Sequence, residues 1–254
     1  AGQTTIQKLD NADALDVGSS WDGGVVPGTN DLAAFGSINT ASSSTLSIGS
    51  GVSFLGIVVT NNLGANITIS GSGGSLTLGS AGIDLSAMTI WRTFNINSAI
   101  VLAADQTWTI GTNSSSNPNV LNTTGVISGA SQLTIDSLAG NDGEYAYLRG
   151  NSTFSGGFVL GSSGAVRVGT TDASVSGGAV TASALGAGSY TINGGIIFGN
   201  SGRVGSTNTT INADFAINNG AAGGANNRLR LFGAFDMAGG ERTVSLGRYT
   251  NSAS

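Results

Sequence analysis

The sequence predicts an all-β protein, and two observations support this class. Short runs in which every second residue is Leu, Ile, Val or Phe recur throughout the 254-residue chain, and a period of two is typical of a strand with one buried face. Gly, Ser and Asn residues separate these runs, and the repeated Gly pairs favour turns because glycine adopts positive φ without a Cβ clash. No convincing amphipathic helix interrupts the pattern.

The strands can be assigned in order along the chain. In residues 75–79, Leu76 and Leu78 occupy one face and Ser75 and Thr77 the other. The same alternation predicts strands at residues 45–48, 56–60, 66–70, 75–79, 93–96, 107–110, 132–135, 165–169, 190–193, 209–212, 228–232 and 243–246.

Three β architectures are compatible with short strands and glycine-rich turns. A sandwich or antiparallel barrel would use hairpins, for which Asp22-Gly23, Asp142-Gly143, Asn193-Gly194 and Asn219-Gly220 are fair signals. A membrane barrel needs aromatic girdles and strands of ~10 residues, whereas aromatic residues make up only 6% of this chain. A parallel β-helix suits small turn residues and short strands. The local pattern leaves the sandwich and the β-helix open.

Composition excludes several classes of function. Charged residues make up 9% of the chain and the net charge is −5, which argues against nucleic-acid binding because that needs clustered Lys and Arg. The sequence contains no Cys, hence no disulfide or thiolate metal site. No apolar run reaches the ~18 residues of a membrane-spanning helix. The start at Ala1-Gly2 fits a processed N-terminus whose targeting segment has been removed.

Two segments have candidate interface residues. If Ala146 and Leu148 point inward, then Tyr145, Tyr147 and Arg149 point outward together. Exposed aromatic rings beside Arg serve protein or sugar contacts, although a simple surface ladder is an equal alternative. A similar outward arrangement is expected for Arg228, Arg230 and Phe232.

Acidic residues suggest two further sites, both weighed against simpler interpretations. Asp10, Asp13 and Asp16, with Asp22 and Asp31, could bind Ca²⁺, but they are spaced too loosely for a known calcium loop. We expect instead a solvated acidic end, with no metal or other cofactor.

The second acidic set is a candidate catalytic face. Asp84, Asp105 and Asp136 recur on successive strands and could form the paired carboxylates of a polysaccharide-degrading enzyme. No partner base is near them, and the chain has no His for a nucleophilic triad. The sequence therefore predicts a protein that is not an enzyme.

The two ends of the chain differ in charge. Residues 1–40 contain five Asp and one Lys, a net charge of −4, whereas residues 200–254 have a net charge of +2. In a β-helix both ends expose an unpaired strand layer. Opposite charges would favour head-to-tail contact, and a contact that does not close produces a filament.

An ordered series of motifs decides between the open architectures. The series resembles the bacterial autotransporter-associated β-strand repeat proteins and includes Ser20-Trp21-Asp22-Gly23-Gly24, the repeat-like stretch at residues 148–157 and Asn193-Gly194-Gly195. Further matching segments are residues 25–28, 31–35, 79–86, 106–108, 125–129 and 184–186.

The resemblance implies a right-handed parallel β-helix exported to the bacterial cell surface. We expect an N-terminal entry or capping region at 1–40 and one continuous β-helix at 41–254. At ~20–25 residues per turn it would have roughly ten to twelve turns and be about 50 Å long.

The expected function is that of an extracellular structural element that binds copies of itself. An adhesin that binds surface glycans is the alternative, and a polysaccharide-degrading enzyme is the third possibility. The sequence departs from the family pattern in having one clear signature repeat and no C-terminal translocator barrel or sorting tail.

Overall fold

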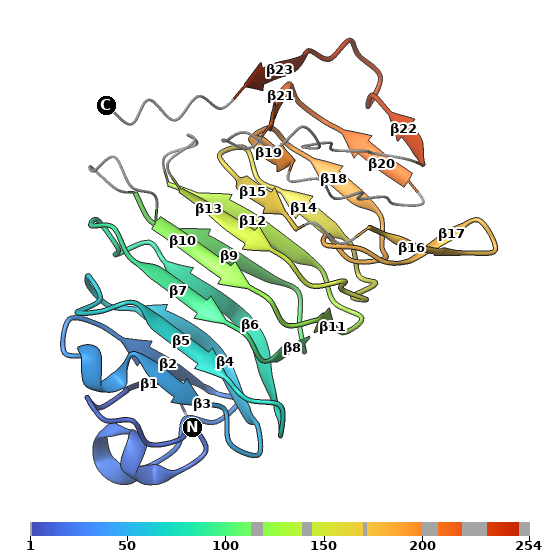
Figure 1. The fold of residues 1–254 in the computed structure, drawn as a ribbon. Coiled ribbons are helices and arrows are strands. Elements are labelled where there is room, and N and C mark those ends of the chain that lie inside the picture. The colour runs from blue at the N-terminus through green and yellow to red at the C-terminus, as the bar shows by residue number, and fades with distance from the viewer. Residues whose placement is uncertain are drawn as a thin grey trace.

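The computed structural model describes residues 2–112, 119–138, 144–169, 172–199, 208–219 and 233–248. They form a parallel β-solenoid of about eight turns, with the N-terminal strands at one end and β22 and β23 at the other (Figure 1). The all-β class and the parallel β-helix are confirmed. The hairpin-connected sandwich that the local pattern left open is wrong.

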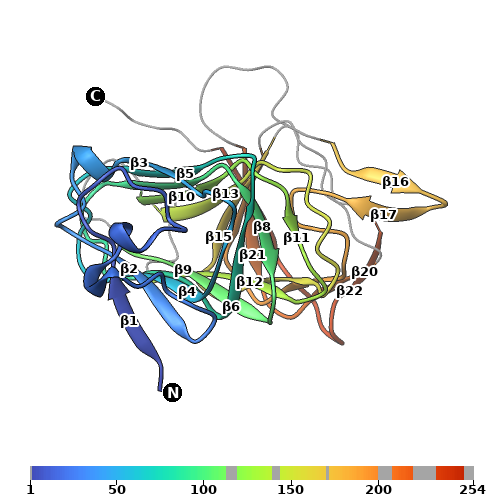
Figure 2. The same cartoon turned by 90° about the horizontal axis from the view of Figure 1, so that it is seen from below.

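Two large sheets form the walls of the solenoid, as the view along its axis shows (Figure 2). The first sheet contains β1 (Thr4–Gln7), β2 (Asp31–Phe35), β4 (Val52–Val59), β6 (Ser75–Leu85), β8 (Ala99–Leu102), β9 (Gln106–Ile110), β11 (Ile127–Ser128), β12 (Leu133–Ser137), β14 (Phe158–Leu160), β18 (Tyr190–Ile192), β20 (Asn208–Ile211) and β22 (Ala234–Asp236). The second sheet contains β3 (Thr45–Ser47), β5 (Ile67–Ser70), β7 (Thr93–Ile96), β10 (Asn119–Thr123), β13 (Glu144–Leu148), β15 (Ala165–Val168), β19 (Ile196–Gly199), β21 (Phe215–Asn219) and β23 (Val244–Arg248).

A short third side joins the two walls in the middle turns. The first part of β6 pairs with β8 from Ser75 to Leu78, and its last part pairs with β9 from Ile83 to Leu85. Strand β8 pairs in turn with β11. One long strand therefore bends around a corner and belongs to two sides of the solenoid.

The predicted number of turns was too high. Contacts between neighbouring turns join residues 27 apart, as from Asn122 Nδ2 to Asn95 Oδ1 and from Thr124 Oγ1 to Asn97 Oδ1. Several turns are therefore longer than the predicted 20–25 residues, whereas Ala146 and Val166 are only 20 residues apart. About eight turns, stacked at about 4.8 Å, give a rod of roughly 40 Å. The right-handed winding remains a prediction.

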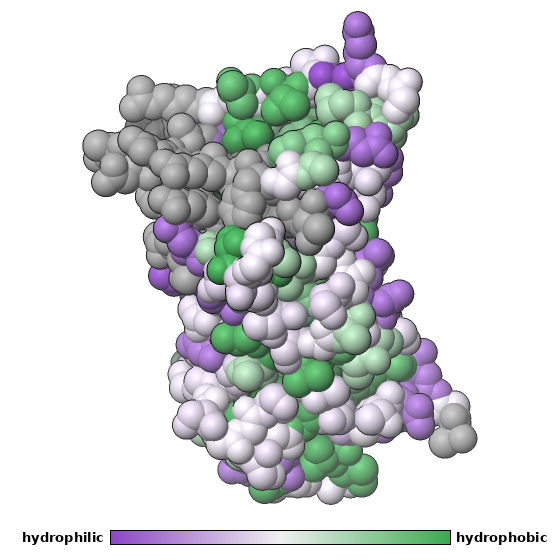
Figure 3. All heavy atoms as spheres, turned by 90° about the vertical axis from the view of Figure 1, so that its right-hand side faces the viewer, coloured by the Kyte–Doolittle hydropathy of each residue, from purple (hydrophilic) through white to green (hydrophobic). Residues whose placement is uncertain are grey.

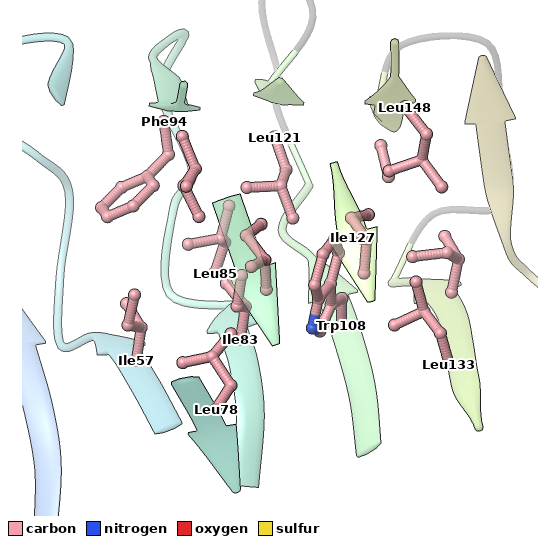
Figure 4. Close-up of a cluster of buried hydrophobic side chains, with 14 of the residues drawn as sticks. Ile57, Leu78, Ile83, Leu85, Phe94, Trp108, Leu121, Ile127, Leu133 and Leu148 are labelled. Atoms are coloured by element: carbon pink, nitrogen blue, oxygen red, sulfur yellow. The ribbon is translucent and has the colours of Figure 1, made fainter. Parts of the chain in front are cut away.

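Stacked columns of apolar side chains fill the interior. In the first sheet, register pairs place Ile57, Ile83 and Trp108 above one another, and in the second sheet Phe94 and Leu121. All five side chains are buried, and Figure 4 shows them converging between the sheets. Inward side chains thus stack on their counterparts in the next turn, and the alternation predicted from the sequence is what builds the core.

The N-terminal segment covers the first turn. It contains the 3-10 helices η1 (Gly18–Ser20) and η2 (Asp22–Gly24), and η3 (Ala41–Ser43) follows β2. The buried Trp21 packs edge-on against Phe35 and Phe54, at ring-centroid distances of 6.2 and 5.6 Å. Its Nε1 donates to the Leu15 carbonyl at 2.8 Å, and Leu15 N donates to Ser47 O at 2.9 Å. This segment therefore closes the N-terminal end of the core.

The predicted division of the chain at residue 40 remains a prediction. Strand β1 pairs in parallel with β2, and β2 with β4. The hydrogen-bonded ladder thus begins at Thr4, inside the predicted entry region.

Most predicted strands coincide with strands of the structure, but the hairpin signals at Asp22-Gly23 and Asn193-Gly194 do not mark hairpins, and those at Asp142-Gly143 and Asn219-Gly220 are not fully within the described residues. Asn193-Gly194 connects β18 of the first sheet to β19 of the second, so it forms a corner. The antiparallel pair in the described residues is β16 (Ser174–Ser176) with β17 (Ala179–Ala182), turning at Gly177 and Gly178, and it projects from the rod (Figure 1). Both glycines have positive φ, 58° and 84°, as such a turn requires. The predicted strand at 228–232 lies outside the described residues.

Candidate functional site

The structure brings the predicted aromatic residues of β13 together with two arginines. Ala146 and Leu148 are buried in the core, so Tyr145 and Tyr147 lie on the outer face, where they are half-buried, and Arg149 follows them, exposed. The tyrosine rings meet edge-on, 6.4 Å apart at an angle of 68°. The register of β13 and β15 places Tyr147 opposite Arg167. We call Tyr145, Tyr147, Arg149 and Arg167 the arginine–tyrosine cluster.

Both guanidinium groups of the cluster lie over tyrosine rings. Arg149 Cζ is 5.1 Å from the centroid of Tyr147, and Arg167 Cζ is 4.9 Å from the same centroid and 5.9 Å from that of Tyr145. Such distances allow cation–π attraction. The buried Phe198 of β19 packs beside the cluster, with its ring 5.7 Å from that of Tyr145.

Sequence reasoning missed Arg167 as a member of this cluster and Phe198 as its buried neighbour. Both lie on later strands, and only the register of β13, β15 and β19 shows that they are neighbours. Alternation within the predicted strand 165–169 already placed the Arg167 side chain on the opposite face of the sheet from Val166 and Val168. The sequence pattern did not show which strands become neighbours in successive turns. The other predicted set, Arg228, Arg230 and Phe232, lies outside the described residues.

The N-terminal aspartates bind the chain's own loops. Asp10 accepts hydrogen bonds from Thr40 N at 3.0 Å and Thr40 Oγ1 at 2.6 Å. Asp16 accepts from the backbone and side chain of Ser50, both at 2.8 Å, and these bonds lower the pKa of the Asp16 carboxyl. These two carboxylates tie the N-terminal segment to the following turns.

Asp13 acts within the N-terminal segment itself. Its Oδ2 accepts a hydrogen bond from Ser19 Oγ at 2.6 Å, and its backbone carbonyl accepts one from Ser20 Oγ at 2.8 Å. The three predicted aspartates are thus fixed by separate partners. Across the described residues, no three acidic side chains converge in a group that could hold a metal ion.

Lys8 is the buried cation of the N-terminal segment. Its Nζ donates to the carbonyl oxygens of Leu9 and Asn11 at 2.9 and 3.0 Å and to Asn11 Oδ1 at 2.8 Å. Burial lowers the pKa of the Lys8 ammonium from 10.5 to about 8, although the attraction of Asp13 and Asp10 raises it. Its hydrogen bonds hold the segment in place between β1 and η1.

The candidate catalytic acids are not brought together. Thr109 of β9 is the register partner of Asp84 on one side and of Asp136 on the other. The two aspartates are therefore two strand spacings apart, about 10 Å. Asp84 accepts from Ser86 N at 2.8 Å and Asp136 from Ser137 N at 3.0 Å. Asp105 precedes β9 and binds Gln132 N at 2.7 Å. Each carboxylate is thus occupied by a nearby backbone amide.

The last turn exposes residues that belong to the core. Register pairs in the second sheet continue the column of Val166 through Ile197 and Ile217 to Leu246. Val166 and Ile197 are buried and Ile217 is half-buried, but Leu246 is 80% exposed. Val244, whose register partner is Phe215, is 38% exposed, and Phe235 of β22 is 46% exposed. In Figure 3 hydrophobic side chains gather at this upper end of the molecule.

Comparison with known proteins gives no assignment of family. No family model, curated protein or solved structure matches the chain. In the part of the chain that the structure describes, no helix has the length and apolar character needed to cross a membrane.

Proposed function

We propose that this protein is a non-enzymatic, extracellular structural element that stacks end to end through its last turn. The observation that supports this most directly is the core column that ends at Leu246, a side chain 80% exposed although it continues a buried series. Strands β22 and β23 end the two sheets among the described residues. A free strand edge beside apolar side chains favours pairing with another chain.

The opposite end has complementary properties. Residues 1–40 have a net charge of −4 and residues 200–254 a net charge of +2. The segment that covers the N-terminal end exposes Val17 and Val25. In a head-to-tail arrangement, the exposed apolar side chains of the last turn therefore meet an N-terminal segment that is acidic and partly apolar. Such a contact is heterologous and does not close on itself, so it extends into a filament.

Location outside the cell is part of the same proposal. The absence of Cys from the sequence suits an exported bacterial protein, and the motif series that resembles autotransporter-associated β-strand repeats supports export and a right-handed winding. A surface of Ser, Thr and Asn in a chain with 9% charged residues suits a structural role.

Sedimentation and electron microscopy of purified protein test the stacking. We expect the wild-type sedimentation coefficient to rise with concentration and micrographs to show chains of rods. Leu246→Asp places a charge in the contact and should leave single rods at every concentration. Val175→Asp is the matched control, because Val175 is 53% exposed on the β16–β17 hairpin, away from the last turn.

Two results would contradict the proposal. Wild-type protein that remains as single short rods at high concentration would exclude end-to-end assembly. Equal loss of assembly in Val175→Asp and Leu246→Asp would show that the contact lies elsewhere.

A further inference from the structure

The arginine–tyrosine cluster on the outer face of β13 and β15 concentrates positive charge. Arg149 and Arg167 both approach the ring of Tyr147, with Cζ atoms 5.1 and 4.9 Å from its centroid. Within the described residues neither guanidinium forms an ion pair with a carboxylate. The chain as a whole has a net charge of −5. Among the described residues, two neighbouring cations without a carboxylate partner are therefore a local exception in an acidic protein.

The hydrogen bonds of Arg167 are incomplete. Its Nη1 donates to Tyr145 Oη at the long distance of 3.5 Å, and its Nε is buried without a hydrogen-bond partner among the described residues. An unpaired buried donor carries a cost in free energy, larger when the group is charged. By contrast, Arg92, which lies beside β7 in the same sheet, donates to the carbonyl oxygens of Leu63 and Gly64 at 3.0 and 3.3 Å. Arg92 is satisfied by the chain itself, and Arg167 is not.

The aromatic rings supply a second kind of contact. Tyr145 and Tyr147 are half-buried, so part of each side chain is exposed beside the guanidinium groups. Apolar ring surface beside a cationic fork is suited to a ligand that has both an apolar face and an anion. A sugar ring that bears a carboxylate has both, whereas an inorganic anion has only the charge.

We propose that the arginine–tyrosine cluster binds a carboxylated polysaccharide. The guanidinium groups of Arg149 and Arg167 bind the carboxylate, and the rings of Tyr145 and Tyr147 pack against the sugar. Glu144 lies on the core-facing side of β13, because it alternates with Tyr145, and does not share this surface. The cluster lies on β13 and β15, strands that are inside the second sheet and not at its ends, so stacking at the ends does not involve it.

Binding to alginate, a polymer of uronic acids, tests this assignment. Alginate whose carboxyl groups have been esterified is the matched probe without the charge. We expect the wild-type protein to bind alginate, to lose that binding as salt is raised, and to bind the ester at least tenfold more weakly. The double variant Arg149→Gln/Arg167→Gln should bind alginate at least tenfold more weakly than wild type, and Tyr147→Leu should weaken it as well.

The controls separate this site from general charge attraction. Arg92→Gln removes one positive charge beside β7 of the second sheet and should change alginate binding less than twofold, whereas Arg149→Gln and Arg167→Gln should each weaken it more. Circular dichroism confirms that each variant is folded. Polyglutamate and inorganic sulfate should compete poorly. Equal binding of alginate and its ester, unchanged binding by the double variant, or no binding by wild type would overturn the proposal. Tighter binding of polyglutamate than of alginate would assign the site to acidic peptides, and full competition by sulfate would assign it to simple anions. Either result would also overturn the proposal.

Discussion

At the scale of single residues, the N-terminal segment depends on a buried cation. Lys8, the only lysine in the sequence, has no exposed surface and donates to three oxygen atoms of Leu9 and Asn11. These bonds hold the segment against β1, but the charged form of the amine loses its hydration. The free energy of unfolding should therefore depend on pH through the titration of Lys8.

We expect the wild-type protein to gain stability relative to Lys8→Met as pH rises from 8 to 10.5. The folded-state pKa of Lys8 is about 8 and its ordinary value is 10.5, so in this window the unfolded chain binds more protons than the folded one, and the free energy of unfolding rises with pH. The gain relative to the variant should approach about 3 kcal/mol. Urea unfolding of both proteins at several pH values measures it. A difference that stays constant from pH 7 to 10.5 would contradict the lowered pKa.

At the scale of elements, the strands were predictable and the order of their stacking was not. Leu76 and Leu78 face inward as their alternation required, because the side of a strand is decided by neighbouring residues. The length of a turn depends instead on corners. Register partners in neighbouring turns are 31 residues apart at Ala165 and Ile196 but only 19 apart at Tyr190 and Thr209.

This dependence on corners also explains what was missed at the candidate site. Tyr145, Tyr147 and Arg149 share one strand segment and were found by alternation. Arg167 joins them only through the register of β13 and β15. The number of turns was overestimated because several turns are longer than 25 residues. The spacing between register partners reaches 32 residues at Phe158 and Tyr190, where the β16–β17 hairpin is inserted.

Close stacking at one corner gives a second prediction. A Cβ added to Gly125 would collide with the carbonyl oxygen of Ser98 in the turn below, and one added to Gly150 would collide with that of Gly125. Gly125→Ala should therefore force neighbouring turns apart and lower the free energy of unfolding by about 1–3 kcal/mol. Urea unfolding followed by circular dichroism measures the loss. Gly2→Ala is the control, because no heavy atom lies within 4 Å of its added Cβ, and a similar loss in both variants would show that the corner is not tightly packed.

At the scale of the whole molecule, the two ends are built differently. Trp21 and Leu15 are buried beneath the N-terminal segment, whereas Leu246 is largely exposed at the other end. The sequence indicated opposite charges at the ends but not this difference in closure. Closure depends on how residues 8–28 fold back over the first turn, which alternation does not describe.

The parallel ladder also determines how the rod responds to force. Hydrogen bonds between turns run along the axis, because every strand of the two large sheets pairs in parallel with the turn above or below it. A pull between the ends therefore loads these bonds one layer at a time. Where a turn spans 27 residues, its release should lengthen the tether by roughly 90 Å, at about 3.4 Å per extended residue. Single-molecule pulling should show a series of small steps, and a single rupture of the whole domain would mean that the turns fail together.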